Sequence, residues 1–441
     1  MNKKIVVACV VVGLAITLSV SVALATGYRW PGSTSTNLSN SKNLRVTTFD
    51  MGSNGDMAVA WARSDLDRVY GSLNTGSGWS APTALVPDMN AWSPYLAYAD
   101  TTPFLTWVSG DLPVYQTTVL TIYEREMSGG TPRVVADGIY ASPQVSLWPN
   151  MAAGQDGLHI VFAATDNITD SNAYRWDLYY TYRPYTQTNW IEPTVVVTYS
   201  QVVPESDPGT RVWYPRVSES PDGKVHVVWR QEERYGMLPE YSIWYVEGTR
   251  SGSDISWGSA VQLSPGSQLL AARPDILADA AGRVHVVWAE LSDTANSPEE
   301  QYPNYMQLGW AAPIRLDPSY FKVSAMNPTW VRATLAVRGE RVCVTWHGFR
   351  EDEVPLGHPE EILLRCSMDG GQTWDELLNI SNTPTDVSVS PVSAIDATGR
   401  IHIVWEENTG AIENKYDYDV YYAYGPTQVD FVFLPLVFRG F

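Results

Sequence analysis

The sequence is poor in several features that define familiar classes of protein. It has 29 basic residues against 48 acidic ones, which gives a net charge of −19. Such a negative field repels nucleic acid and anionic membrane surfaces, and it repels anionic sugars unless local arginines overcome it. No stretch keeps a 3.6-residue apolar period, so helices should be scarce. The sequence therefore points to a strand-rich protein that does not bind nucleic acid.

Cysteine is also rare, with three residues in the whole chain. Cys9 lies in the N-terminal segment, so Cys343 and Cys366 alone are left in the body of the chain. These two can form a disulfide outside the cell, or they can be two buried free thiols. The sequence leaves both alternatives open.

Long apolar runs are absent except at the N-terminus. Lys3 and Lys4 precede an apolar run from Ile5, which ends in Ala23-Leu24-Ala25. A basic start, an apolar middle and small residues at the end are typical of a secretory signal. We therefore predict a signal peptide over residues 1–25 and a secreted or extracellular protein. The run is long enough to cross a bilayer, so an uncleaved anchor is the alternative.

What the sequence does contain is a repeat. The segments "SPDGKVHVVW", "DAAGRVHVVW" and "DATGRIHIVW" end at Trp229, Trp288 and Trp405. Weaker copies end at Trp61, Trp107, Phe162 and Trp346, and the seven anchors are 46, 55, 67, 59, 58 and 59 residues apart. Each unit has a strand, a Gly-bearing turn and an alternating strand that ends on the anchor, followed by a Tyr-rich strand and a last short strand.

Units of four short strands in seven copies predict an all-β fold, a β-propeller. We predict seven four-stranded blades over residues 26–425, with six blades as the alternative. The segment 28–40 is expected to supply the outer strand of the last blade, because ring closure removes free edges. The apolar tail 426–441 is expected to be a closing strand or a surface-retention segment.

The repeat also accounts for most histidines. His159, His226, His285 and His402 stand three residues before their anchors, in a position that holds Ala, Phe or Cys in other units. Such a position is a packing position, so we predict a structural role and no metal site. No EF-hand or His-rich ligand spacing occurs, and we expect no cofactor, with Ca²⁺ held by loop carboxylates as the alternative.

The stretch "SMDGGQTW", residues 367–374, follows the third strand of the sixth unit. Ser367 and Asp369 can bond nearby backbone amides, Gly371 can take a positive φ, and Trp374 can pack the hairpin against its blade. The stretch matches the Asp box, Ser-x-Asp-x-Gly-x-x-Trp, so the chain resembles the sialidase (BNR-repeat) superfamily of propellers. In that family the Asp box lies on the face away from the active site.

The opposite face, where the inner strands begin, carries the residues expected to bind a ligand. Aromatic rings can stack on sugars, and guanidinium groups hold carboxylates. A solvated rim with aromatics that plug the ring is the alternative. The candidates are Trp92, Trp148, Trp213, Tyr214 and Trp330, with Arg216, Arg273 and Arg332. Carboxylates follow the anchors at Asp65, Asp111, Asp166, Glu232, Glu290, Asp352, Glu406 and Glu407.

The family resemblance implies further roles. Arg45 would correspond to the arginine that begins the family's triad for a substrate carboxylate, and Arg63 with Asp65 or Asp67 to a second arginine and an acid. The family's nucleophile is a tyrosine near the inner strand of the last blade, where this chain has "SVSPVSAID" without tyrosine. Tyr214 is the remaining candidate for that role.

The residues of the expected ligand-binding face and the family resemblance together lead to a prediction of function. We predict a propeller that recognises carbohydrate or cell-surface ligands without catalysis; the alternative is an exo-glycosidase of sialidase type that uses an arginine cluster. A Ser-His-Asp hydrolase is disfavoured, because only His347 and His358 lie outside the packing position and no Gly-x-Ser-x-Gly segment accompanies them.

Overall fold

The structure is a computed structural model. It describes residues 35–39, 44–63, 66, 68–86, 90–110, 118–141, 148–164, 176–197, 210–235, 238–264, 269–292, 300–316, 331–348, 360–383, 386–408 and 418–426. The predicted signal segment and the tail beyond residue 426 lie outside these ranges. None of the described residues is helical, so none of them belongs to a helix that is long and apolar enough to cross a membrane.

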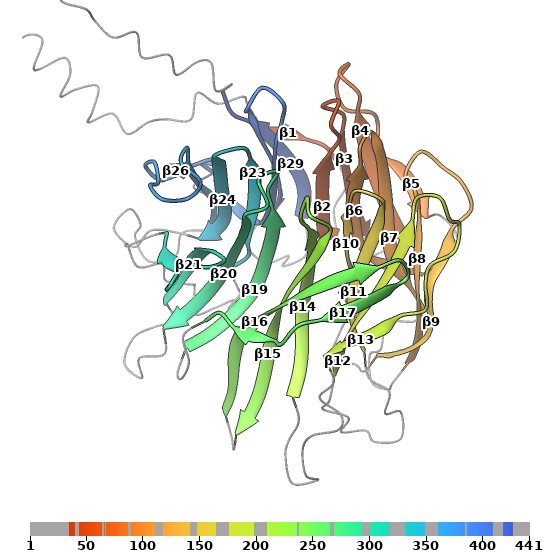
Figure 1. Ribbon diagram of the computed structural model, residues 1–441. Helices are drawn as coiled ribbons and strands as arrows, with labels where there is room; N and C mark the ends of the chain where they lie inside the picture. Colours follow the sequence, from red (N-terminus) through yellow and green to blue (C-terminus); the bar gives the residue numbers. More distant parts are fainter. Residues whose placement is uncertain are drawn as a thin grey trace, which may run out of the picture.

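The chain forms a seven-bladed β-propeller of four-stranded antiparallel sheets, as the repeat predicted (Figure 1). The first three blades follow one another along the chain. Their strands are β2 (Leu44–Met51), β3 (Met57–Arg63), β4 (Arg68–Asn74) and β5 (Thr83–Val86); β6 (Ala91–Ala99), β7 (Thr102–Ser109), β8 (Thr118–Glu126) and β9 (Arg133–Ala141); and β10 (Asn150–Ala153), β11 (Gly157–Ala164), β12 (Asp177–Pro184) and β13 (Thr194–Val197).

The fourth and fifth blades share one sheet, because a parallel bridge at Tyr241 and Leu270 joins them. Their strands are β14 (Thr210–Glu219), β15 (Lys224–Tyr235), β16 (Leu238–Ser251), β17 (Asp254–Trp257) and β18 (Val261–Gln262); then β19 (Leu269–Ala278), β20 (Val284–Ser292), β21 (Glu300–Gln307) and β22 (Ile314–Arg315). The sixth blade holds β23 (Ala333–Arg338), β24 (Arg341–Gly348), β25 (Glu361–Ser367) and β26 (Leu378–Asn379).

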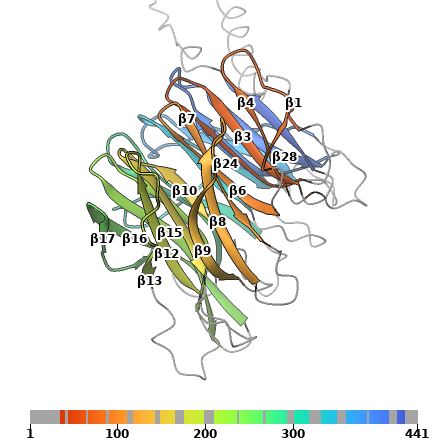
Figure 2. The ribbon, with the colours of Figure 1, turned by 90° about the vertical axis from the view of Figure 1, so that its right-hand side faces the viewer.

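The last blade is completed by the N-terminal part of the chain. It consists of β27 (Val387–Ile395), β28 (Ile401–Asn408), β29 (Tyr418–Tyr424) and the short strand β1 (Thr36–Asn37), which pairs with β29. Ser39 strengthens this closure, since its Oγ donates to Asp419 Oδ1 at 2.7 Å and accepts the Val420 N–H at 3.0 Å. The inner strand β27 contacts β2, so the first and last blades lie side by side (Figure 2).

The core lies between neighbouring blades, and the repeat anchors fill it. All the anchors are at most 2% exposed: Trp61, Trp107, Phe162, Trp229, Trp288, Trp346 and Trp405. Burial of large aromatic side chains is the main favourable term for such a fold. The anchor pattern of the sequence is thus a packing pattern.

The four repeat histidines are structural, as their position predicted. Each is buried, and each Nδ1 lies 2.7–2.8 Å from the hydroxyl of a tyrosine on the third strand of its blade. On the other side of the ring, the His285 Nε2 faces Asp279 at 3.4 Å. Burial lowers the pKa of these imidazoles, most clearly in the interior of the third blade at His159. The neutral rings therefore act as hydrogen-bonding struts across the blade.

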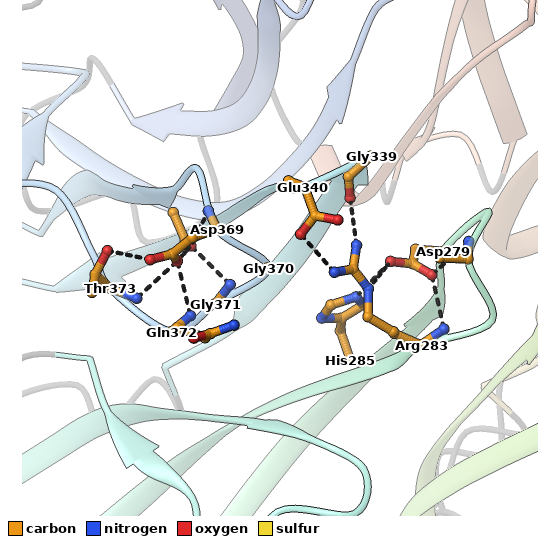
Figure 3. Close-up of polar contacts among 12 residues, drawn as sticks. Asp279, Arg283, His285, Gly339, Glu340, Asp369, Gly370, Gly371, Gln372 and Thr373 are labelled. Atoms are coloured by element: carbon orange, nitrogen blue, oxygen red, sulfur yellow. Dashed lines mark hydrogen bonds and ion pairs between the residues drawn. The ribbon is translucent and has the colours of Figure 1, made fainter.

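The "SMDGGQTW" hairpin joins β25 to β26 and docks on the preceding blade. Asp369 accepts N–H groups from Gln372 and Thr373 at 3.0 and 2.8 Å (Figure 3), while Ser367 Oγ accepts the Gly371 N–H at 2.8 Å. Gly371 has φ +95, and a Cβ there would collide with the Tyr305 ring. Trp374 packs edge-on against that same ring at 4.9 Å. The hairpin is therefore a scaffold element.

A second contact links the same two blades. The guanidinium of Arg283 lies between Asp279 and Glu340, at 2.6 Å from a carboxylate oxygen of each, and also donates to the Gly339 carbonyl at 3.0 Å (Figure 3). Within the sixth blade, Cys343 and Cys366 are opposite each other on β24 and β25 and form a disulfide, which is the first of the two alternatives left by the sequence.

Candidate functional site

The site begins with a distortion that recurs at the same point of the inner strands. Four of them show a register shift at the repeat proline, and β2 shows one at the equivalent position, between Arg45 and Thr47, where the chain has no proline. The residue before the proline has a positive φ in five blades, at Ser93, Trp148, Tyr214, Arg273 and Ser390, with values from 43 to 55. A non-glycine residue pays about 1–3 kcal/mol for such a conformation, and this strain gathers at functional sites.

These strained residues surround a cavity of about 360 Å³ where the inner strands meet. Three repeated positions supply its polar lining. The position before the proline gives Ser93, Trp148, Tyr214, Arg273, Arg332 and Ser390; the position after it gives Tyr95, Arg216, Asp275 and Thr334; and the position after the last anchor gives Glu406. The bulges therefore turn one side chain per blade toward the common axis.

Three arginines and three carboxylates line this cavity, but among the described residues only Arg216 lies within 4.0 Å of a carboxylate. Arg216 Nε lies 3.9 Å from Asp275 Oδ1, a long ion pair, and its guanidinium lies 5.5 Å from the Tyr95 ring. Among the described residues, neither Arg273 nor Arg332 has a carboxylate within 4.0 Å, and the Nε of each is buried without a hydrogen-bond acceptor. Burial, with Arg216 nearby, lowers the pKa of Arg332 to about 10, so it stays charged at neutral pH.

Three carboxylates line the cavity, Asp50, Asp275 and Glu406, and burial disfavours the charged form of each. Burial raises the pKa of Asp275, although Arg216 and the Leu335 N–H, which it accepts at 3.0 Å, lower it. Burial also raises the pKa of Glu406, against the pull of Arg332 and of the Thr47 N–H that it accepts at 2.8 Å. For both Asp275 and Glu406, burial opposes the charged form while the neighbouring guanidinium and backbone N–H favour it.

His347 is not part of the cavity lining, but it accepts backbone hydrogen bonds from two residues that line the cavity. Its Nδ1 accepts the N–H groups of Arg332 at 3.4 Å and of Ser390 at 3.3 Å, which puts the ring proton on Nε2. Burial, followed by the charges of Arg273 and Arg332, lowers the pKa of His347 to about 3. The ring is therefore neutral, and its buried Nε2 has no acceptor.

Unused donors are the common feature of this region. Besides His347 and the two arginines, the indole Nε1 of Trp148 is buried without an acceptor. Buried donors are almost always paired in folded proteins, so a cluster of unpaired ones needs an explanation. An anionic ligand with several oxygens would satisfy them together.

The structure brings together five of the predicted site residues: Trp148, Tyr214, Arg216, Arg273 and Arg332 all line the cavity. The Tyr214 ring lies 4.8 Å from the Trp148 ring and 5.4 Å from the Arg273 guanidinium. The predicted nucleophile candidate therefore stands beside the arginine cluster.

Other predicted residues lie elsewhere. Trp92 is 9% exposed and donates to the Gly110 carbonyl at 3.4 Å, and Trp213 donates to Glu232 Oε2 at 2.7 Å; neither lines the cavity. Arg63 lies 5.5 Å from the Tyr70 ring. Arg45 is opposite Ala62 in the β2–β3 pair. Asp65, Asp67 and Trp330, like His358, fall outside the described residues.

Sequence reasoning singled out neither Tyr95, Asp275 nor His347 as a ligand-binding residue. Tyr95 and Asp275 directly follow the repeat proline, as Arg216 does, so alignment of that position in all units was the available signal. Of the carboxylates after the anchors, Glu406 lines the cavity, whereas Glu232, Glu290 and Glu407 are buried and are not part of its lining. In the described ranges, no group of three or more His, Cys, Asp or Glu is placed to hold a metal ion.

Comparisons with known proteins support the fold. No protein-family model and no curated protein matches the chain. Among solved structures, an ulvan lyase of polysaccharide lyase family PL25, bound to -[GlcA(1-4)Rha3S]-, has a TM-score of 0.58 at 11% identity, covering 90% of this chain and 98% of that one. The polysaccharide lyase Uly1 has a TM-score of 0.55 at 9% identity, covering 91% and 93%.

A leech intramolecular trans-sialidase is more distant, with a TM-score of 0.46 at 12% identity, covering 91% of this chain and 70% of that one. At these identities the similarity establishes the propeller fold alone. Membership of the sialidase superfamily, and with it the Asp-box assignment, stays a prediction.

Proposed function

We propose that this protein recognises acidic carbohydrate in its central cavity. The observation that carries the proposal is the pair of cavity guanidiniums, Arg273 and Arg332, that lack a carboxylate within 4.0 Å among the described residues. In this proposal they hold the carboxylate of a sugar acid, and the rings of Trp148 and Tyr214 pack on the sugar face.

The overall charge of the chain makes this arrangement selective. Removal of the predicted signal would leave 48 acidic and 27 basic residues, a net charge of −21. An anionic ligand is repelled by such a surface and is attracted only where guanidinium groups have no neighbouring carboxylate. The proposal therefore assigns anion binding to the cavity and to no other surface.

Catalysis is the second candidate function. The two candidate reactions are hydrolysis of sialidase type and elimination of polysaccharide-lyase type. The inner strand β27 carries no tyrosine, which speaks against a sialidase-type nucleophile there, although Tyr214 stands beside the arginines. The ulvan lyase and Uly1, whose TM-scores are above 0.5, are both polysaccharide lyases. In a lyase, a guanidinium would neutralise the uronate carboxylate and make its α-proton more acidic. Tyr214, as the phenolate, would take that proton while the β C–O bond breaks, and water would protonate the departing sugar oxygen.

Binding is tested with single-residue variants by calorimetry. The protein is titrated with uronic-acid and sialic-acid saccharides and with neutral sugars of the same size. Arg332→Gln is expected to weaken binding of the acidic ligand by about 10- to 100-fold, the range for loss of a charged hydrogen bond. Arg338→Gln, which removes an exposed arginine at the other end of β23, is the matched control and should leave binding unchanged. Equal affinity of wild type and Arg332→Gln would refute the proposal.

Catalysis is tested on the same ligands. Ultraviolet absorbance of an unsaturated uronate would reveal elimination, and release of reducing sugar without that absorbance would reveal hydrolysis. Turnover lost in Tyr214→Phe would establish an enzyme, whereas tight binding without turnover is the result expected for a recognition protein.

We also propose export of the chain. The basic start, the apolar run and Ala23-Leu24-Ala25 support it, as does a disulfide between Cys343 and Cys366. N-terminal sequencing of the exported protein should begin at Thr26. A chain that keeps Lys3 would contradict cleavage.

A further inference from the structure

Among the described residues, the fourth blade has the longest pairing between its second and third strands, which form a hairpin. Its strands β15 and β16 have 12 and 14 residues, while no other described strand exceeds 10. They pair without interruption from Lys224↔Thr249 to Tyr235↔Leu238. Figure 1 shows β14 and β15 extending beyond the strand ends of the other blades, on the side where β14 begins. This is the side on which the strained cavity residues lie.

At the base of this hairpin, aromatic rings of β14 and β16 surround one buried cation of β15. The guanidinium of Arg230, which is 4% exposed, lies 4.8 Å from the Trp213 ring, 5.0 Å from the Tyr214 ring and 4.5 Å from the Tyr241 ring. Such contacts are stronger when the cation is desolvated, as it is here. The Trp213 indole is also tied to Glu232 at 2.7 Å. The rings are therefore held in place, while Trp213 and Tyr241 keep part of their surface exposed.

The hairpin is continuous with the cavity. Tyr214 lines the cavity, and its ring contacts the Trp148 and Arg273 side chains there and the Trp213 ring, at 6.1 Å, on the other side. A row of aromatic and guanidinium groups thus leads from Arg273 outward to Tyr241. The residues of this row that lie outward of Tyr214 are Trp213, Arg230 and Tyr241. They do not line the 360 Å³ cavity, so they do not hold the acidic sugar itself.

We infer that the blade-four hairpin is a second sugar-binding subsite, where Trp213 and Tyr241 stack on the sugars that adjoin the acidic one in the cavity. The inference rests on the proposed function and deepens it: the ligand is an acidic oligosaccharide and not a single sugar acid. Fixed aromatic rings lose little conformational entropy on binding, which is the property a stacking platform requires. Arg230 is a positioning residue here, because it holds the rings and is itself buried.

The test compares chain lengths on the purified full-length protein. Calorimetry measures the affinity for glucuronic acid and for a glucuronate-containing tetrasaccharide, in wild type, in Trp213→Leu and in Tyr241→Leu. Wild type should bind the tetrasaccharide at least about tenfold more tightly, as two aromatic contacts imply. Each variant should lose most of that gain while its affinity for glucuronic acid is unchanged. Tyr185→Leu, an exposed aromatic in the turn after β12, should behave as wild type.

The outcomes separate the inference from the proposed function. Equal affinity of wild type for both ligands would overturn the subsite and leave the cavity proposal intact, and so would variants that keep the full gain. Binding of neither ligand would overturn both. Unchanged affinity for glucuronic acid shows that a variant is folded, and the comparison within wild type needs no variant at all.

Discussion

Arg273 and Arg332 occupy the same position of two neighbouring repeats, the residue before the proline or its equivalent. The same position holds serine, tryptophan and tyrosine in other blades, so the fold does not require a cation there. The packing positions, in contrast, hold tryptophan or phenylalanine in every blade. Variation at a strained position of an otherwise regular repeat is what singles out a functional residue.

Asp50 carries a pH dependence that can be measured without any ligand. It lines the cavity and accepts the Tyr98 N–H at 2.7 Å, and burial raises its pKa from 3.8 to about 6. Between these two values the folded state keeps the proton that the unfolded state releases. Its contribution to stability is therefore full below about 3.8 and is lost as the pH rises through about 6.

The prediction is that Asp50→Asn is more stable than wild type above pH 6, by on the order of 2 kcal/mol, and that the difference shrinks toward pH 4. Urea unfolding at several pH values measures it. Glu240→Gln, which removes an exposed carboxylate, is the control and should run parallel to wild type. A constant difference between Asp50→Asn and wild type at all pH values would contradict the assignment.

At the scale of elements, the hairpin after β25 illustrates how side chains replace backbone partners in a turn. The hydrogen bonds that Asp369 accepts, from Thr373 first, lower its pKa to about 2. A depressed carboxylate stabilises the fold above its unfolded pKa, and the stabilisation is lost as the pH falls through about 2. Trp374 of this turn packs on Tyr305 of the neighbouring blade. Loss of the Asp369 hydrogen bonds should therefore also weaken the contact between the fifth and sixth blades.

We therefore expect Asp369→Asn to lower the denaturant midpoint at neutral pH and to flatten the acid-unfolding curve below pH 4. Asp254→Asn, at the first residue of β17 in the fourth blade, is the matched control, because Asp254 is exposed and directly follows a tight turn. Circular dichroism during acid titration compares the variants. Identical curves for both would mean that the Asp369 bonds add nothing.

The repeat made the strands of each blade predictable. The features that were not predicted are those that the repeat does not encode. Anchor tryptophans and histidines three residues earlier fix the second strand of each blade and its core contacts. The inward bulge was not predicted, since a residue before proline ordinarily avoids positive φ, as at Tyr214 and Arg273. The cavity chemistry of Asp275 and Glu406 depends on which blades face each other across the axis, and no local pattern encodes that.

At the scale of the molecule, ring closure depends on a few residues at the start of the described chain. Ser39 is 5% exposed and bonds both Asp419 and Val420. Ser39→Ala is expected to cost about 1–2 kcal/mol, because it leaves the buried Val420 N–H without its acceptor. Chemical denaturation measures it, with Ser77→Ala, an exposed serine of the first blade, as control. A midpoint equal to that of the control would show that closure does not depend on Ser39.

The closure of the ring also determines when the seventh blade can be completed. Ser39 and Asp419 are 380 residues apart in sequence, so the seventh blade cannot be completed until nearly the whole chain has been made. Until β29 is made, β1 and the apolar face of the first blade have no partners in the last blade, and such exposed edges are prone to aggregate. The last blade is therefore the final one to close, and the N-terminal strand must stay available while the other six blades are made.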